Sequence, residues 1–590
     1  MRAIALCVLC LAGCAASVAP PEPRLPLQSE SASGWTPKPG WTSNNFMVAT
    51  AHPLATDAGY RILRAGGSAL DAAIAVQMVL TLVEPDASGI GGGAFLMHWD
   101  GAAVQAWDGR ETAPAGVDAK LFVGPDGQPV AFAQAKLGGR AVATPGVLKM
   151  LQAAHRQHGR LPWAQLFEPA IALAEDGFPL GARLHSLLQQ DDTLKRDTRA
   201  RAYFFDAEGE PHPVGHLLRN PALAAVMRSL AAQGSEAFYR GPMAAELAQR
   251  VHADAVPGAL SQTDLASYVP RQRDAMCTLW LSIYRVCGMP PPSSGHLAVM
   301  QILGMLERVP GSLGPARDAD SLHAYAEASR LTFADRAQYV ADPDFAAAPG
   351  ASWASLLDAG YLDERAALIG THAMKAAPVG QPPGGQRSAW APMPPQPEHG
   401  TSHISVVDAQ GQAVAMTTSI EAVFGAHVMA DGGTGLAGGY LLNNQMTDFS
   451  FAPTDAQGRL VANRVQPGKR PRSSMSPTLV FDARDGRLLM TLGSPGGPFI
   501  IHYVAKTLLG TLAWSLDPQR AIDLPNVGLV NGPLLLEPGA FSTTTIDGLR
   551  QRGHRVVEAE LPSGLQAIQR TASGWRGGAD PRREGTALGD

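Results

Sequence analysis

The chain of 590 residues is long enough to bury a large core and to form more than one domain. Its hydrophobic fraction of 45% and charged fraction of 17% are those of a globular protein and exclude a disordered one. The formal net charge of -5 gives no basic footprint, so no nucleic-acid partner is expected.

Residues 1–13 predict an export signal. An apolar run, too short to span a membrane as a helix, follows Arg2 and ends in Leu11-Ala12-Gly13-Cys14. This ending resembles a bacterial lipoprotein box, which implies a lipid on Cys14 and an anchored protein in the periplasm. An ordinary signal that is cut a few residues later also fits. Residues 14–41 are interpreted as a flexible tether rich in Pro and Ser.

Helical patterns dominate from Phe46 to about Leu368. Helical spacing in "TDAGYRILRAGG" ends at its two glycines, and Ser68 then begins a second helix with Asp71 completing a capping box. The apolar run of this second helix, Ala72 to Val83, is too short for a membrane span and predicts a buried core helix. Further amphipathic helices are expected over "GVLKMLQAAHRQHG", "LFEPAIALAEDG" and "ALAAVMRSLAAQG".

Two other patterns in this part concern cofactors and cysteines. "SGIGGGAF" has the glycine spacing of a dinucleotide loop, but it follows a helix and precedes a strand, so close backbone packing is the better interpretation. The histidines show no metal-ligand spacing, and neither a cofactor nor a metal is expected. Cys277 and Cys287 lie on two short apolar stretches that can pair across a sheet, where a disulfide and two buried thiols are equal alternatives.

Residues 374–400 are dense in Pro and Gly and predict an exposed, mobile connection. Strands follow, with hairpins at Asp408–Gly411 and around "DARDGRLLM", and the last helices are expected near "FIIHYVAKTLLGTLAW". The chain therefore passes from a mainly helical part to a strand-rich part close to residue 400.

The junction Gly400-Thr401 permits a chemical role. A threonine hydroxyl is a weak nucleophile, but an N-terminal threonine carries its own base, an α-amino group with a pKa near 8. Gly400 leaves its carbonyl open to attack by that hydroxyl, so the chain is able to cut itself here. His403 is interpreted as structural. Composition alone makes the cut only permissible, because threonine before a hairpin is common.

Several segments together resemble one family, the γ-glutamyltransferases (glutathione hydrolases), which are N-terminal nucleophile hydrolases. They occur in the family order and cover most of the chain beyond the tether. These segments are "MVATAHPLATDAGYRILRAGGSALDAAIAV", "VEPDASGIGGGAF", "DGRETAP", "MPPPSSG", "GTSHISVVDAQGQAV", "LLNNQMTDFS", "GKRPRSSMSPTLV", "GSPGG" and "DPRREGTALGD".

The resemblance implies an α+β fold, a four-layer αββα sandwich, in a precursor that cuts itself between Gly400 and Thr401. The products are a large, mainly helical subunit (42–400) and a small, strand-rich subunit (401–590). Thr401 then attacks the amide of a γ-glutamyl peptide such as glutathione, and the acyl-enzyme passes the glutamyl group to water or to an acceptor amino acid or peptide. Membrane contact is expected only through the lipid.

The family motifs also imply a role for each matching residue. The oxyanion is expected at Gly496 and Gly497, the nucleophile beside the Ser419 hydroxyl, the substrate α-carboxylate at Arg110, Ser473 and Ser474, and the α-ammonium at Asp448, Gln445 and Glu421. Without the resemblance, Arg110 is better interpreted as a surface ion pair with Glu111 or Asp108.

Glu421 departs from the family pattern because it replaces an asparagine. A carboxylate binds an ammonium, but it cannot donate a hydrogen bond. The departure leaves open a β-lactam acylase of the same fold that takes a glutaryl group, although the retained Arg110 and Asp448 favour a γ-glutamyl group. An inactive lipid-anchored binding protein is a second alternative, and the intact Thr401, Gly496 and Gly497 argue against it.

Overall fold

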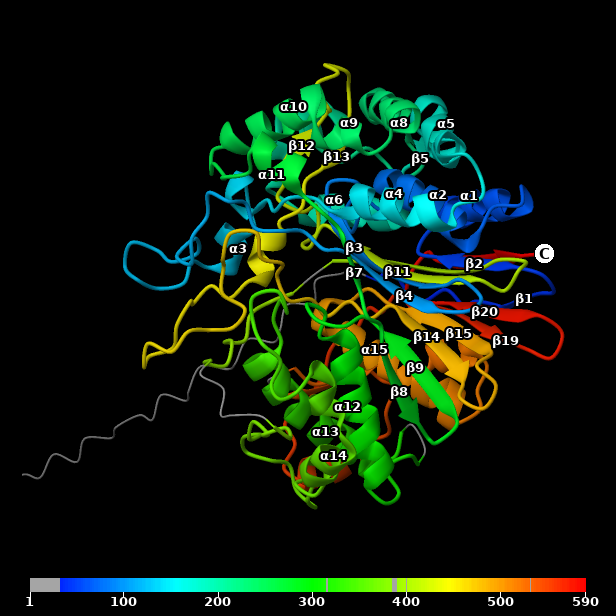
Figure 1. Cartoon of the computed structure of the whole chain (residues 1–590), viewed down its shortest axis with the longest axis vertical. Coiled ribbons are helices and arrows are strands. Elements are labelled where there is room, and N and C mark those ends of the chain that lie inside the picture. Colours follow the sequence, from blue (N-terminus) through cyan, green and yellow to red (C-terminus); the bar gives the residue numbers. More distant parts are fainter. Residues whose placement is uncertain (1–31, 315–316, 385–389, 399, 531) are drawn as a thin grey trace, which may run out of the picture.

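The structure is a computed structural model that describes residues 32–314, 317–384, 390–398, 400–530 and 532–590. Two sheets of seven strands are stacked face to face within these residues, and helices cover both outer faces, which makes four layers (Figure 1). The predicted αββα sandwich is therefore confirmed. Cys14 and the predicted export signal lie outside the described residues.

The first sheet pairs strands from both parts of the chain. Its central pair is the predicted hairpin, in which Ser402 lies opposite Thr418 and Val407 opposite Ala413. In order across the sheet, the strands are β21 (Thr586–Gly589), β2 (Met47–Thr50), β10 (Ser402–Val407), β11 (Ala413–Ser419), β3 (Gly93–Trp99), β4 (Val104–Gly109) and β7 (Arg271–Arg273).

The second sheet contains the other predicted hairpin, β14–β15. It also joins Cys277 and Cys287, which lie opposite each other on β8 and β9, as a disulfide. In order across the sheet, the strands are β1 (Trp41–Ser43), β20 (Trp575–Ala579), β19 (Gln566–Arg570), β15 (Leu488–Gly493), β14 (Thr478–Asp482), β9 (Tyr284–Gly288) and β8 (Met276–Trp280).

Alternation along the strands explains the layers. On β3, Leu96 packs toward the helices outside the first sheet, while Phe95 and Met97 pack between the two sheets. The outer helices on this side are α1 (Pro53–Arg64), α2 (Ala69–Val83), α4 (Val147–His158), α5 (Glu168–Asp176), α6 (Ala182–Gln190), α7 (Thr198–Phe204), α8 (Pro221–Gln233), α9 (Glu236–Tyr239) and α10 (Gly241–His252).

The second helical layer covers the other sheet and includes the last helices of the chain (Figure 1). Helices were expected in this segment, and a π-helical turn, Leu509–Ala513, extends α15 there. The helices are α12 (Gly295–Arg308), α13 (Ala319–Tyr339), α14 (Ala359–Ala366), α15 (Ile500–Leu508), α16 (Pro518–Asp523) and α17 (Thr543–Gln551).

Short elements complete the described fold. They are α3 (Phe132–Ala135), α11 (Gln262–Ser267), β5 (Phe178–Pro179), β6 (Leu217–Leu218), β12 (Met429–Ala430), β13 (Tyr440–Leu441), β16 (Val527–Gly528), β17 (Leu534–Leu536) and β18 (Val556–Glu558).

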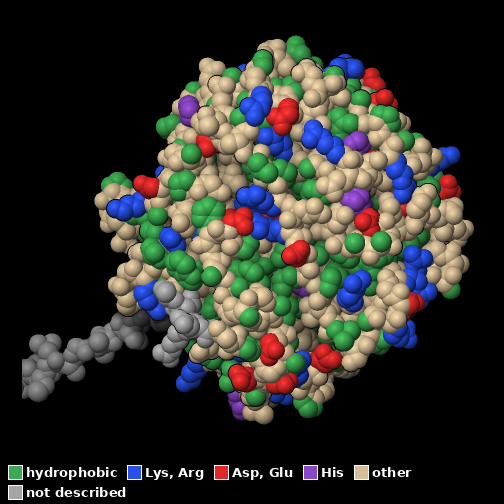
Figure 2. Space-filling view, in the orientation of Figure 1, with side chains coloured by type: hydrophobic (Ala, Val, Ile, Leu, Met, Phe, Trp, Pro, Cys, Tyr) green, Lys and Arg blue, Asp and Glu red, His purple; other side chains and the backbone are tan. Residues whose placement is uncertain are grey.

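Helix α2 matches its sequence prediction closely. Ser68 and Asp71 form the reciprocal capping box, the helix ends at Val83 with Glu84 as its C-cap, and every residue of it is buried. In the part of the chain that is described, no helix combines the length and the apolar character that crossing a membrane requires. On the face that Figure 2 shows, basic and acidic side chains are intermixed and form no continuous basic area.

Two segments are more firmly packed than the sequence suggested. Ser33 and Thr36, from the predicted tether, donate backbone hydrogen bonds to the C-terminal residues Arg582 and Pro581. Ala391 and Met393, from the predicted mobile connection, are buried and bind the backbone of Leu460 and Ala337. The prediction of an exposed connection is wrong here, because Pro-rich composition disfavours regular structure without preventing packing against a distant surface.

Candidate active site

The Gly400-Thr401 junction lies buried at the start of β10. Thr401 directly precedes the strand, and the Ser419 hydroxyl at the end of β11 donates a 2.7 Å hydrogen bond to the Gly400 carbonyl oxygen. The pairing of β10 with β11 brings these residues together. Ser419 thus contacts the carbonyl of the bond that is predicted to be cut.

Glycines make room for this arrangement. A Cβ on Gly400 would lie 2.2 Å from the backbone oxygen of Glu421, and one on Gly92 would lie 2.1 Å from that of Ser419. Neither position accepts a side chain unless the backbone moves. Gly92 belongs to "SGIGGGAF", so the close packing expected of this segment is present, and it fixes the end of β11.

A cavity of about 20 Å³ lies beside Thr401. Most of the predicted site residues border it, although Glu421, Gly400 and Gly496 are not among its described lining residues. The lining consists of the predicted residues Arg110, Thr401, Ser419, Gln445, Asp448, Ser473, Ser474 and Gly497, together with Glu398, Met475 and Ile500, which the sequence analysis did not select.

Arg110 is buried, so the alternative of a surface ion pair is wrong. Its guanidinium group forms an ion pair with Asp448 and donates to the carbonyl oxygens of Pro471 (3.3 Å) and Arg472 (3.0 Å). Glu111 lies 3.6 Å from the same guanidinium group, and burial raises the pKa of Glu111 to about 8. In the uncut chain, Arg110 and Asp448 therefore contact each other.

Asp448 and Gln445 present unused acceptors. Gln445 donates to Asp448 Oδ2 at 2.6 Å, while Asp448 Oδ1 and Gln445 Oε1 are buried and have no hydrogen-bond partner in the described residues. Burial raises the pKa of Asp448, against the opposing effect of Arg110. Buried acceptors without donors are costly, so this end of the site suits a ligand that brings N–H groups.

Glu421 lies close to Gly400, and its backbone is strained, with a φ of 77°. Its carboxyl group accepts a hydrogen bond from Asn444, and its Oε1 is buried with no partner among the described residues. Burial, and then the nearby Asp448, raise its pKa well above the ordinary value. A pKa raised in this direction favours the protonated form of Glu421, which can donate a hydrogen bond as a carboxylate cannot.

Gly496 and Gly497 follow β15 and precede α15. Gly496 has a φ of 131°, and a Cβ on it would lie 2.5 Å from the Tyr503 ring, so the turn requires glycine. Gly497 borders the cavity that Thr401 lines. The oxyanion site at Gly496 and Gly497 stays a prediction.

His403 does not face the cleavage junction. Its ring nitrogens bind the hydroxyl groups of Thr417 (2.9 Å) and Ser405 (3.0 Å), and burial lowers its pKa to about 3. A neutral histidine held by two hydroxyl groups is structural, as predicted.

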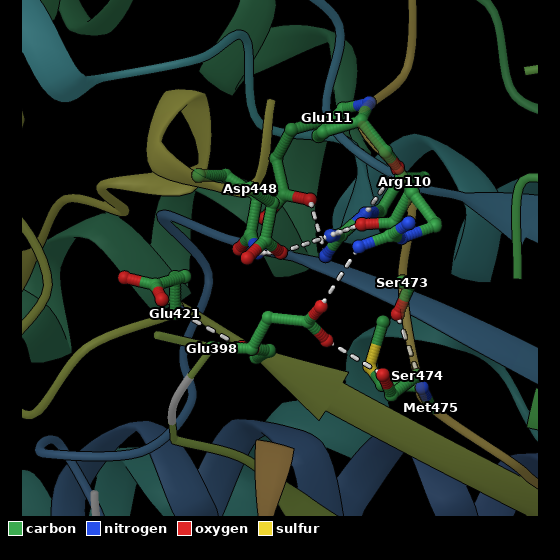
Figure 3. Close-up of polar contacts among 12 residues, drawn as sticks. Arg110, Glu111, Glu398, Glu421, Asp448, Ser473, Ser474 and Met475 are labelled. Carbon is green, nitrogen blue, oxygen red and sulfur yellow. Dashed lines mark hydrogen bonds and ion pairs between the residues drawn. The ribbon is translucent and has the colours of Figure 1, made fainter. Parts of the chain in front are cut away.

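Glu398 is the principal group that sequence reasoning missed. Figure 3 shows its carboxyl group pointing into the space that Arg110, Asp448 and Ser474 border. It accepts hydrogen bonds from Arg336 (2.7 and 2.8 Å), Ser474 (2.6 Å) and Arg472 (3.3 Å). The sequence held one signal that could have pointed to this anion site, namely the arginines in the segments "LTFADRAQY" and "RPRSSM".

The chain was compared with known proteins. The family model for gamma-glutamyltranspeptidase matches residues 55–590. The glutathione hydrolase proenzyme of Bacillus subtilis (strain 168) is 33% identical over 554 residues, which cover 92% of this chain and 91% of that protein. The acylase ACY 1 proenzyme of Pseudomonas sp. (strain V22) is 34% identical over 560 residues, covering 93% of this chain and 94% of that protein.

Solved structures agree with the sequence comparison. The cephalosporin acylase from Bacillus halodurans superposes with a TM-score of 0.79 at 26% identity, covering 96% of this chain and 99% of that one. The match of the family model over nearly the whole chain, together with relatives that align over nearly their whole lengths, shows that this protein belongs to the gamma-glutamyltranspeptidase family.

Proposed function

We propose that this protein is a glutathione hydrolase and γ-glutamyltransferase whose nucleophile is Thr401. One observation carries the proposal: Thr401, Gly497 and the residues with unused acceptors, Asp448 and Gln445, border a single cavity. The relatives named glutathione hydrolase proenzyme support a γ-glutamyl donor and a chain that is made as a precursor.

The first reaction cuts the precursor. The Thr401 hydroxyl oxygen attacks the Gly400 carbonyl carbon, the C–N bond breaks, and the released nitrogen takes the proton, leaving an ester between Gly400 and Thr401. Water then hydrolyses this ester. The Ser419 hydroxyl, already bonded to the Gly400 oxygen at 2.7 Å, stabilises the oxyanion in the first step. The products are a large subunit ending at Gly400 and a small subunit, 401–590.

The second reaction uses the freed threonine. Its α-amino group removes the proton from its own hydroxyl group, whose oxygen attacks the γ-glutamyl carbonyl carbon while backbone N–H groups at Gly496 and Gly497 stabilise the oxyanion. The amine of the donor leaves with a proton, and an acyl-enzyme remains. Water or the amino group of an acceptor amino acid or peptide then takes the glutamyl group.

The α-ammonium group of the donor provides N–H groups that suit this end of the cavity. It brings donors to the Asp448 and Gln445 oxygens that have no partner, and Glu421 adds a further acceptor near them. A glutaryl donor has no ammonium group and would leave these atoms unsatisfied. The acceptors therefore favour a γ-glutamyl donor over a glutaryl one.

Self-cleavage is tested by electrophoresis and N-terminal sequencing. Purified protein should give two bands, of which the smaller begins at Thr401, and Thr401→Ala should remain uncut and inactive because it has no hydroxyl group. A single full-length band after long incubation, or a cut at another bond, would contradict the mechanism.

A β-lactam acylase remains the second candidate, since the acylase ACY 1 proenzyme and the cephalosporin acylase structure resemble the chain over nearly their whole lengths. Hydrolysis of γ-glutamyl and glutaryl anilides by the same preparation separates the two functions. The proposed function predicts the higher kcat/KM for the γ-glutamyl anilide, and a preference for the glutaryl anilide would overturn it.

We also propose export through residues 1–13, lipid attachment at Cys14 and a periplasmic, membrane-anchored enzyme. The ending Leu11-Ala12-Gly13-Cys14 supports this, because small residues before a cysteine suit a lipoprotein signal. Mass spectrometry of the N-terminal peptide should find a lipid on Cys14. An unmodified terminus at a later residue would identify an ordinary export signal instead.

A further inference from the structure

The carboxyl group of Glu398 occupies a built anion site. Arg336 reaches both of its oxygens, Ser474 donates to Oε2 and Arg472 approaches Oε1. Burial disfavours the charged carboxylate, but the two arginines, the Arg336 hydrogen bonds and Ser474 outweigh this effect and lower the pKa of Glu398 to about 2. The group is therefore a bound carboxylate, held as a ligand would be.

The arginines that hold Glu398 are fixed by other parts of the fold. Arg336, in the last turn of α13, is 6% exposed and donates to the Ser294 hydroxyl group at 2.8 Å. Arg472 is 5% exposed, and burial, and then the nearby Arg336, lower its pKa to about 10. Two buried guanidinium groups this close need an anion between them, because their mutual repulsion and desolvation are otherwise uncompensated.

Glu398 also fills the space that a donor would need. It borders the cavity together with Thr401, and the volume left is only about 20 Å³. One water molecule needs about 10–15 Å³ of volume measured in this way, so the cavity has room for a water molecule but not for an amino acid while Glu398 is in place. Glu398 precedes Gly400 in the segment that is freed at its C-terminal end by cleavage, so the same cut releases the occupant.

We infer that Arg336 and Arg472 extend the carboxylate site expected at Arg110, Ser473 and Ser474, that they bind the carboxylate of the acyl donor in the cleaved enzyme, and that Glu398 occupies this subsite until the chain is cut. The ligand class is a γ-acyl amino acid whose α-carboxylate replaces the Glu398 carboxylate. This inference rests on the proposed function, and it adds two arginines to the carboxylate end, where Arg110 is paired with Asp448.

Three anilides and one substitution test the subsite in the cleaved enzyme. The γ-glutamyl anilide has both charged groups, the glutaryl anilide has only the carboxylate, and the 4-aminobutyryl anilide has only the ammonium. Arg472→Met should lower kcat/KM about 10- to 150-fold for the two substrates with a carboxylate, through the loss of a charged hydrogen bond. It should leave the 4-aminobutyryl anilide within about twofold of the wild-type value, because that substrate has no group for the arginine to bind.

Arg484→Gln is the matched control, since Arg484 is an exposed arginine on the β14–β15 hairpin and should change none of the three rates. If Arg472→Met lowered kcat/KM equally for all three substrates, Arg472 would have only a structural role, and the proposed subsite would be overturned. An unchanged rate with the γ-glutamyl anilide would overturn it as well.

A second arm needs no catalysis and uses the uncut Thr401→Ala protein. Adding Glu398→Ala should lower its melting temperature, and formate should restore the loss, whereas chloride at the same ionic strength should not. Absence of rescue by formate would overturn the anion site. If the wild-type enzyme hydrolyses no γ-glutamyl anilide while formate rescues the uncut variant, the proposed function fails and the carboxylate site stands.

Discussion

Glu398 and Glu421 show how position decides the behaviour of one residue type. Glu421 is buried and Glu398 keeps only 9% of its side chain exposed, yet arginines lower the pKa of Glu398 while burial and Asp448 raise that of Glu421. Motif resemblance identified Glu421 from the sequence. It could not identify Glu398, because the arginines that give this residue its role lie 62 and 74 residues away in the chain.

At the residue scale, Glu421→Gln should stabilise the uncut Thr401→Ala protein in a pH-dependent way. Because the folded pKa of Glu421 is raised, the stability that its neutral form provides is complete below the unfolded pKa, about 4.5. It is lost as the pH rises toward the folded value. Gln stays neutral and keeps an acceptor for Asn444. Thermal unfolding should show a melting-temperature advantage that grows from pH 4.5 to 8, whereas a constant difference would contradict the shifted pKa.

Ser419→Ala tests the contact with the scissile carbonyl. Loss of the hydroxyl group removes a hydrogen bond to the developing oxyanion, which is worth about 3 kcal/mol, so self-cleavage should slow about 100-fold. A time course on denaturing gels measures the rate. Ser419→Thr retains the hydroxyl group and serves as the control, and equal cleavage rates for Ser419→Ala and the wild type would remove Ser419 from the mechanism.

At the scale of elements, local patterns predicted α2 and both hairpins because capping, periodicity and turn residues act within a few positions. They were less reliable for the connection before residue 400, where packing of Ala391 and Met393 against distant residues overrides the Pro-rich composition. The glycines of "SGIGGGAF" were predictable only in part. Their close packing was expected, but their partner, the end of β11, appears only in the fold.

Gly92→Ala should disturb the cleavage junction from the neighbouring strand. Its new Cβ would meet the Ser419 backbone oxygen at 2.1 Å, so the end of β11 must move and carry the Ser419 hydroxyl away from Gly400. We expect self-cleavage to slow at least about tenfold and the protein to lose about 1–3 kcal/mol of stability. Gly370→Ala is the control because nothing lies within 4 Å of its added Cβ. Equal cleavage by both variants would contradict this packing argument.

At the scale of the whole molecule, the two parts of the chain are interleaved. Strands β10 and β11 pair with β2 and β3 in the first sheet, while β14 pairs with β9 in the second. The parts on either side of Gly400-Thr401 thus share both sheets and the core between them. Cleavage breaks one peptide bond and leaves these ladders intact.

The cleaved protein should therefore elute from gel filtration as one species at the volume of uncut Thr401→Ala, and its two chains should separate only in denaturant. Shared sheets hold the chains together because every paired strand would lose its hydrogen bonds on separation. Separation of the two chains in native buffer would contradict the interleaved arrangement.

The sequence by itself determined the limits of the strongly patterned helices, the two hairpins and the family, and it predicts the bond at Gly400-Thr401 as the one that is cut. Short-range periodicity, capping and motif order carry that information. Only the tertiary structure decided between a disulfide and two thiols at Cys277 and Cys287, paired Arg110 with Asp448 and placed Glu398 between two arginines. These outcomes depend on which distant side chains share one low-dielectric space, and no local pattern in the chain encodes that proximity.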